Sequence, residues 1–379
     1  MTPSATGSPS AAPAAAAKTG TRISELDGLR GIAILLVMFF HFTPRTGPLS
    51  FFSHLFQLGW TGVDLFFVLS GFLITGILVD TVGHRSYYRN FIVRRCLRIF
   101  PAYYMSLVVC CILTYYPFAP RWGEFLRAGG WWYVTYLGNL RVFLDSAWPG
   151  LAILTPLWSL QVEEQFYLSF PLLVWALERK TLAKVLAASV VLALALRIAL
   201  LLAMPKNMFG VYTLMPCRMD ALAMGGLIAI AQRERPEWLK SRWIGWMTLA
   251  AAATVAAIIR FYSNSDPWPF GMQTIGYTAI DLMFAGILII LVHRRQPVLL
   301  RICRWPFLVW VGTISYGLYL LHVPGEVIGR LLTAHLVRLA PSGSAEFLVS
   351  MVVTIALAWI SWSVFESRIL KLKDRFTVR

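Results

Sequence analysis

Arg30 and His41 lie in the apolar stretch LDGLRGIAILLVMFFHF, residues 26–42, with no charged residue between them. In an α-helix, eleven positions amount to about 20° beyond three full turns and a rise of about 16 Å, so both side chains project from one face. Histidine titrates near neutral pH and can take a proton from a hydroxyl group. The pair is therefore a candidate catalytic site, with a structural histidine bonded to a backbone carbonyl as the alternative.

Two adjacent carboxylates, Glu163 and Glu164, stand in a second apolar stretch, LTPLWSLQVEEQFYLSFPLL. Ionisable groups inside membrane helices are energetically expensive and are candidates for function. One carboxylate could orient or charge-stabilise the imidazole of His41, as in hydrolytic triads, and the other could accept a proton from a substrate hydroxyl. The sequence leaves open which residue has which role. Carboxylates satisfied by Trp and Tyr donors are the structural alternative.

A third stretch, RRCLRIFPAYY, begins with the basic residues Arg94, Arg95 and Arg98. Planar guanidinium groups bind phosphate through paired hydrogen bonds, and residues three apart share a helix face. These arginines are therefore candidates for a phosphate-binding site. The alternative is a basic anchor that only sets the orientation of the helix in the membrane.

Acidic residues elsewhere in apolar stretches need partners or ligands. Asp64 and Asp220 are candidate substrate contacts. Arg30 or His41 would also serve as a partner for Asp64. Arg218 lies two positions from Asp220, so the two side chains should reach different neighbours, either as structural pairs or as substrate contacts.

Other polar and small residues receive structural interpretations. His322 is expected to be a polar anchor near the outer surface rather than a second base. Ser70 and Gly71 are small residues that permit close contact between helices. The five cysteines show no paired spacing and are interpreted as apolar packing residues, and no metal site is expected.

The elements that must position these residues are membrane helices. The chain has 379 residues, of which 58% are hydrophobic and 14% charged, and its mean hydropathy is +0.65. A soluble domain has about 25% charged residues, whereas a membrane-spanning helix needs about 20 mostly apolar residues. Ten such segments are predicted, at 24–43, 56–79, 98–118, 157–177, 184–203, 214–232, 243–261, 274–293, 306–329 and 346–366.

The distribution of basic residues predicts the orientation of these helices, because cytosolic loops are enriched in Lys and Arg. If the N-terminus is cytosolic and the short segment 131–144 does not cross, 23 of the 34 Lys and Arg residues lie on the cytosolic side and six on the outer side. Both termini are then cytosolic, with a disordered tail over 1–22 and a basic tail over 371–379. Segment 131–144 becomes an outer-face or re-entrant element that protein must cover. The net charge of +16 is thus a topology signal and does not indicate nucleic-acid binding.

Taken in order, six stretches of the sequence resemble the membrane acyltransferase-3 family. They are LDGLRGIAILLVMFFHF, GVDLFFVLSGFLIT, RRCLRIFPAYY, LWSLQVEEQFYLSFPLL, RMDALAMGGLIA and ISYGLYLLHVP. The resemblance extends over residues 23–370 and implies an all-α integral membrane O-acyltransferase with about ten helices in one bundle. It implies that Arg30 and His41 are essential and that Arg95 and Arg98 form the family's RxxR motif. A standalone form without the C-terminal SGNH-type domain is expected.

The resemblance also implies a reaction. Acetyl or another short acyl group would pass from cytosolic acyl-CoA to a hydroxyl of a carbohydrate or glycoside acceptor at the cytoplasmic membrane, with no permanently bound cofactor. In this hypothesis Arg95, Arg98 and Arg94 hold the CoA phosphates, and Arg30 holds a phosphate or polarises the thioester carbonyl. His41, assisted by one of the two glutamates, deprotonates the acceptor or carries the acyl group transiently. A proton-coupled secondary transporter is the alternative, because buried acids and histidines also form proton relays.

Overall fold

The computed structural model describes residues 23–44, 49–51, 56–116, 121–262, 267–336 and 343–376. In these ranges the ordered elements are helices, and none is a strand, which confirms the predicted all-α fold. The predicted tail over 1–22 lies outside the described residues. The other predicted tail begins as the 3-10 helix η6, Lys371–Phe376, and its last three residues also lie outside them.

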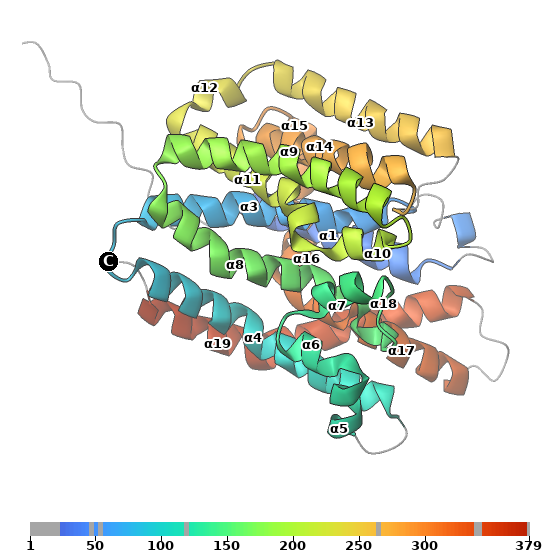
Figure 1. Cartoon of the computed structure of the whole chain (residues 1–379). Coiled ribbons are helices and arrows are strands. Elements are labelled where there is room, and N and C mark those ends of the chain that lie inside the picture. The colour runs from blue at the N-terminus through green and yellow to red at the C-terminus, as the bar shows by residue number, and fades with distance from the viewer. Residues whose placement is uncertain are drawn as a thin grey trace, which may run out of the picture.

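Ten long helices of 16 to 28 residues run roughly side by side through the described part of the chain (Figure 1). Each of them overlaps one predicted span. They are α1 (Ser24–Phe42), α3 (Gly62–Thr81), α4 (Tyr87–Thr114), α8 (Trp158–Ala176), α9 (Arg179–Ala203), α11 (Met215–Glu234), α13 (Trp243–Tyr262), α14 (Tyr277–Val292), α17 (Ser315–Leu336) and α18 (Gly343–Ile360).

Short elements connect or extend the long helices. They are η1 (Gly59–Thr61), α5 (Trp122–Phe125), η2 (Leu126–Gly130), α6 (Trp131–Val134), α7 (Gly138–Asp145), η3 (Ala152–Leu157), α10 (Met208–Thr213), α12 (Pro236–Leu239), η4 (Met272–Gly276), α15 (Pro297–Cys303), α16 (Pro306–Thr313), η5 (Ser361–Glu366) and α19 (Ser367–Leu370). The predicted single span 306–329 is in fact the pair α16 and α17, which meet at an angle of 75°.

Among the described residues, seven helices are long and apolar enough to span a membrane, or eight if the bent pair α16–α17 counts as one. Helices α1 and α8 are not among them, and these two carry Arg30, His41 and the Glu163–Glu164 pair. Helix α1 carries three charged residues, Glu25, Asp27 and Arg30, and α8 carries its two glutamates and two glutamines, although each helix has 19 residues and packs within the bundle. The multi-pass membrane fold is therefore clear, while the count of ten and the cytosolic placement of the termini stay predictions.

The segment 131–144 does not form a long helix. It consists mainly of α6 and α7, of four and eight residues, which at about 1.5 Å per residue are too short to cross a membrane. Protein covers part of it: the backbone N–H of Asn139 donates to Gln161 of α8 at 2.5 Å, and the Asn139 side chain donates to Gln165 at 3.2 Å. Asn139 is only 1% exposed. The segment is therefore too short to cross, but protein covers it only in part, because Trp131, Leu137 and Leu144 are exposed.

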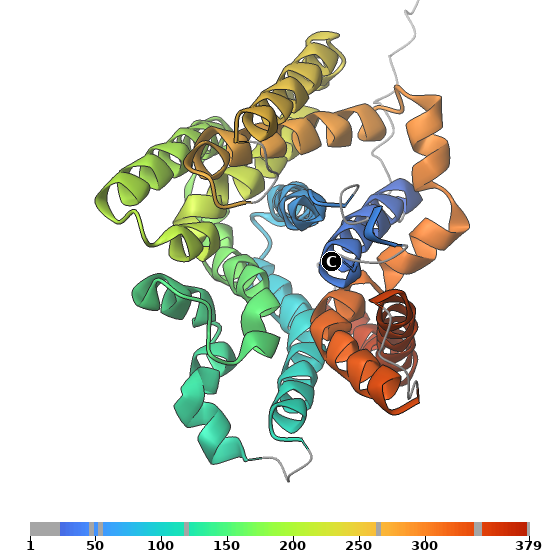
Figure 2. The ribbon, with the colours of Figure 1, turned by 90° about the vertical axis from the view of Figure 1, so that its right-hand side faces the viewer.

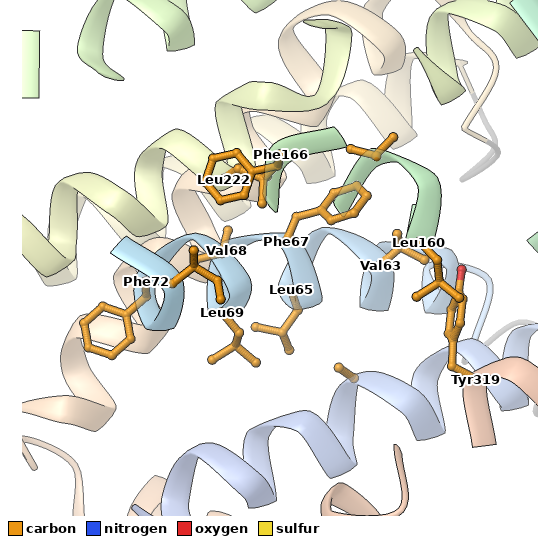
Figure 3. Packing of buried hydrophobic residues seen from close by; sticks show 14 of the residues in the cluster. Val63, Leu65, Phe67, Val68, Leu69, Phe72, Leu160, Phe166, Leu222 and Tyr319 are labelled. Atoms are coloured by element: carbon orange, nitrogen blue, oxygen red, sulfur yellow. The ribbon is translucent and has the colours of Figure 1, made fainter. Parts of the chain in front are cut away.

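Helix α3 is the central element, with neighbours around it when the bundle is viewed along its axis (Figure 2, light blue). Its buried side chains point to more than one side, with Leu65 and Leu69 toward α1 and Phe67 toward the opposite side (Figure 3). On another side Gly71 packs on the backbone of Leu222 in α11, and Gly225 packs on the backbone around Val68. These glycines let the two helices approach closely, as predicted for Gly71.

Ion pairs join several of the predicted cytosolic loops to one another at one end of the bundle. Glu25 at the start of α1 pairs with Arg304 after α15. Asp80 at the end of α3 pairs with Arg233 in α11 at 2.6 Å, and Arg179 pairs with Glu234 at 2.8 Å. The basic loops assigned to one side of the membrane from sequence are thus on one side of the molecule.

The contact between α3 and α11 generates a stability prediction. A Cβ atom at Gly71 would lie 2.7 Å from the carbonyl carbon of Leu222, and a backbone atom cannot yield as a flexible side chain can. Gly71→Ala is expected to lower the free energy of unfolding by about 1–3 kcal/mol, measured as the thermal unfolding midpoint in detergent. Gly245→Ala on α13, where a Cβ meets open space, is the matched control. Equal midpoints for both variants would contradict the close packing.

Candidate active site

A cavity of about 770 Å³ lies between α1, α3, α4, α8 and α17. Its lining includes three of the arginines singled out in the sequence, together with Ser70, Glu163 and Tyr167. Along α3 the lining extends from Val63 to Ile74, which is about 16 Å of helix. The cavity is thus long enough to hold an extended ligand that follows α3.

A second, wider cavity of about 1250 Å³ adjoins the first and shares Arg30, Leu73, Arg98 and Tyr316 with it. Its wall also contains Ile23, at the start of α1, and residues of α19 and η5. We call this second cavity the vestibule. Because the vestibule lies where α1 begins, the passage from vestibule to inner cavity starts at the basic end of the bundle and passes between Arg30 and Arg98.

The three arginines Arg30, Arg95 and Arg98 line the inner cavity, and none of them forms an ion pair within the described ranges. Arg95 and Arg98 are three apart on α4, so they share a face, as predicted. The Arg95 guanidinium lies 5.7 Å from the ring of Tyr167, where it is held by a cation–π contact. Arg94, one position from Arg95, is not among the residues that line either cavity. The walls thus combine these three guanidinium groups with the carboxylates of Glu163 in the inner cavity and of Asp27 and Glu366 in the vestibule.

Helix α4 explains why these arginines face inward. It begins at Tyr87, eleven residues before the predicted span, so Arg95 and Arg98 lie on the helix itself and not in a loop before it. Arginine is a good helix former, and the run continues without a break into the apolar part. The helix therefore sets the direction of both side chains.

Glu163 is the carboxylate of the inner cavity. It accepts hydrogen bonds from the hydroxyl of Ser70 at 2.6 Å and from that of Tyr167, one turn along α8, at 3.0 Å. It is close enough to Arg30 and Arg98 for their charges to interact. The prediction that Ser70 only permits helix contact is therefore wrong, because its hydroxyl lines the cavity and binds Glu163.

Glu164 points elsewhere, since adjacent residues on a helix differ by about 100° in direction. It is 5% exposed, lines neither cavity, and its Oε1 has no hydrogen-bond partner in the described part of the chain. The structure thus distinguishes the two adjacent carboxylates, which the sequence could not.

Tyr319 of α17 closes the inner cavity at the end where α3 begins. It lies beside Leu160 near Val63 (Figure 3), and its hydroxyl is 2.6 Å from that of Ser159. His41 is not among the residues that line the cavity. It lies beyond Tyr319 and is exposed at the far end of α1 from the vestibule.

His41 has a different neighbourhood from the predicted one. Its Nδ1 is 2.9 Å from the carbonyl oxygen of Val37, and its ring is 4.8 Å from that of His322, centroid to centroid. In the described residues, neither Glu163 nor Glu164 forms a hydrogen bond with His41. His322 is fully buried and contacts His41, so its interpretation as a polar anchor near the surface is wrong.

The remaining acidic candidates belong to buried ion pairs on the other side of α3. Asp64 pairs with Arg218 of α11, so the predicted partners Arg30 and His41 are both wrong. Asp220 pairs with Arg197 of α9 at 2.8 Å, which confirms that Arg218 and Asp220 reach different neighbours. All four side chains are fully buried, and neither aspartate lines the cavity or the vestibule.

Sequence comparison identifies the family. Residues 23–363 match the family described as Acyltransferase domain. The chain belongs to the acyltransferase-3 family. This confirms the family expected from the six stretches and supports the predicted class of enzyme, an O-acyltransferase.

Two proteins similar to this chain are named as O-acetyltransferases. The chain is 31% identical to the putative peptidoglycan O-acetyltransferase YrhL of Bacillus subtilis, over 81% of this chain and 49% of that protein. It is 29% identical to the peptidoglycan O-acetyltransferase OatA of Listeria monocytogenes, over 80% of this chain and 49% of that protein. The acyltransferase-3 chain therefore spans about half the length of these relatives. No solved structure matches it.

The buried pairs generate a prediction that separates stability from substrate binding. Asp64→Ala leaves the Arg218 charge buried and uncompensated, which is expected to lower the free energy of unfolding by about 3–5 kcal/mol. The double variant Asp64→Leu with Arg218→Met should recover most of that loss in thermal unfolding experiments. The control is Asp145→Asn, which breaks the exposed Arg141–Asp145 pair and should cost at most about 1 kcal/mol. Normal stability in Asp64→Ala together with a raised KM for the acceptor would instead support the substrate contact expected from sequence.

Proposed function

We propose that this protein transfers an acyl group, by default acetyl, from acyl-CoA to a hydroxyl of a carbohydrate. The observation that carries the proposal is the passage lined by Arg30, Arg95 and Arg98, whose charges have no ion-pair partners in the described ranges. Arginines inside membrane proteins are normally paired, as Arg197 and Arg218 are here. Unpaired guanidinium groups around an empty passage favour an anionic ligand.

The donor site follows from the shape of the two cavities. The vestibule is the larger of the two spaces, and the inner cavity is largely apolar apart from its arginines and Glu163. Acyl-CoA has a polyanionic nucleotide end and a thin pantetheine arm, which suit these two spaces in that order. Arg98 and Arg30 lie at the junction and bind phosphate. Arg95 and the Ser70–Glu163 pair lie along the arm.

The acceptor would approach from the opposite end. His41 is exposed at the end of α1 away from the vestibule, so donor and acceptor need not compete for one opening. A carbonyl oxygen only accepts hydrogen bonds, so the Nδ1 of His41 carries the proton that reaches Val37, and its Nε2 keeps a free lone pair. That nitrogen is a suitable general base for an acceptor hydroxyl. This chemistry favours the base role for His41 over transient acyl transport.

The reaction then balances without a further reagent. The acceptor oxygen attacks the thioester carbonyl as His41 takes the hydroxyl proton, the C–S bond breaks, and the proton passes to the thiolate of CoA. For the thioester to reach His41, the hydrogen bonds of the Tyr319 hydroxyl with Ser159 and with the carbonyl oxygen of Pro156 must open. The relatives named as peptidoglycan O-acetyltransferases support a carbohydrate acceptor, with peptidoglycan as the first to test. With acyl-CoA as a cytosolic donor, we infer that the reaction takes place at the cytoplasmic membrane.

Removal of the proposed base should stop turnover. His41→Ala is expected to lower kcat for CoA release from acetyl-CoA by about 10²–10⁴-fold, because general base catalysis contributes that much. The assay uses purified protein in detergent with soluble peptidoglycan fragments or other oligosaccharides as acceptors. Wild-type turnover in His41→Ala would overturn the base role. Uptake of substrate into vesicles without any acceptor-dependent CoA release would favour the transporter alternative.

Loss of a phosphate contact should raise KM for the donor. A charge-assisted hydrogen bond is worth about 1.5–3 kcal/mol, so Arg98→Gln is expected to raise KM for acetyl-CoA roughly tenfold or more while kcat changes little. Arg94→Gln is the matched control on the same helix, because Arg94 lines neither cavity. An unchanged KM in Arg98→Gln, or an equal rise in both variants, would contradict the donor site.

A further inference from the structure

His322 of α17 is a second histidine whose role the proposed reaction leaves unexplained. It is 0% exposed, and its Nδ1 is 2.6 Å from the carbonyl oxygen of Tyr319. Because a carbonyl oxygen only accepts hydrogen bonds, the Nδ1 of His322 carries the proton, and its Nε2 can only accept a hydrogen bond. That Nε2 is buried and has no hydrogen-bond partner within the described ranges.

An unpaired nitrogen in the interior requires an explanation. Buried polar groups are almost always hydrogen-bonded, and an unsatisfied one is destabilising. A histidine that served only to bond the backbone of α17 would gain nothing from this second nitrogen, and an asparagine could make the same bond. The His322 ring lies beside the imidazole of His41, with the two ring centroids 4.8 Å apart and an interplanar angle of 68°.

Among the described residues, the Tyr319 ring lies 5.4 Å from that of His322, but its hydroxyl is already hydrogen-bonded to Ser159 and to the carbonyl oxygen of Pro156. Phe40 contacts the His41 ring edge-on at 5.2 Å, and Phe42 lies 6.4 Å from the His322 ring. Both are apolar. When His41 takes a proton at Nε2 it gains an N–H donor and a positive charge, and the lone pair on His322 is the polar group placed to receive that donor.

We propose that His322 is a positioning residue for acyl transfer: its Nε2 accepts a hydrogen bond from His41 once His41 has taken the acceptor proton. This inference rests on the proposed function of His41 as the base. The proton moves from the acceptor hydroxyl to His41, is held between the two imidazoles, and leaves to the CoA thiolate after the C–S bond breaks. His322 makes no contact with acyl-CoA and acts through His41.

The two amide substitutions separate this role from a structural one. Asparagine can still donate to the Tyr319 carbonyl but presents nothing at the Nε2 position, whereas the longer glutamine places its amide oxygen near that position. His322→Asn is expected to lower kcat roughly ten- to hundredfold and to leave KM for acetyl-CoA near its wild-type value. His322→Gln should retain more of kcat than His322→Asn. A purely structural role predicts the reverse order.

The matched control is His335→Asn on the same helix. The Nδ1 of His335 is also bonded to a backbone carbonyl, that of Leu331 at 2.7 Å, but the residue is exposed. This variant is expected to keep wild-type kcat and KM. In addition, His322→Asn placed in a His41→Ala background should cause no further loss of residual CoA release, because the two residues act as one unit.

The outcomes are distinguishable. Wild-type kcat in His322→Asn would overturn the inference while leaving the proposed function intact. A loss shared equally by His322→Asn and His322→Gln, with a lowered unfolding midpoint or a raised KM, would assign His322 a structural role and also overturn it. Failure of the wild-type protein to release CoA with acetyl-CoA and soluble peptidoglycan fragments or other oligosaccharides would overturn the proposed function, and the inference with it.

Discussion

A guanidinium group keeps its charge under all physiological conditions, and removing that charge from water is expensive unless an anion compensates it. This constraint divides the buried and half-buried arginines of the bundle into two groups. Arg197 and Arg218 are compensated by Asp220 and Asp64, and they help to hold α9, α3 and α11 together. Arg30, Arg95 and Arg98 line the cavities without an ion pair in the described ranges, with the carboxylates of Glu163, Asp27 and Glu366 in the same walls. The first group stabilises the fold, and the second is the one that the proposed function assigns to the donor.

Helix α3 lies between the paired arginines and those that line the cavity, and other helices pack around it. Its glycine contact with α11 brings the backbone of one helix against the other, while Leu65 and Leu69 face α1. Asp64 points to the paired cluster, and Ser70, six positions later, points to the cavity. Six positions on a helix correspond to about 600°, or 120° short of two full turns, so one helix can contribute to both sites. Close packing of α3 on α11 thus keeps the paired arginines apart from those that line the cavity.

Much of the fold was predictable because apolar runs determine where helices form in a membrane. The ten long helices overlap the ten predicted spans, and segment 131–144 is too short to cross, as its interrupted pattern indicates. The start of α4 was not predictable from hydropathy, because its first turns are polar and basic while helix formation depends on backbone propensity. The 75° angle between α16 and α17 was likewise hidden within one continuous apolar run.

The sequence by itself determined the helical membrane fold, the family and the chemical types of the site residues, because these depend on local composition and spacing. It placed Arg30 and His41 on one helix and Arg95 and Arg98 on another. Only the tertiary structure decided which groups meet. It put Glu163 and not Glu164 in the cavity, paired Asp64 with Arg218, and brought His322 against His41. Contacts between distant helices depend on the rotation of each helix about its axis, and that rotation is set by packing with all neighbours at once.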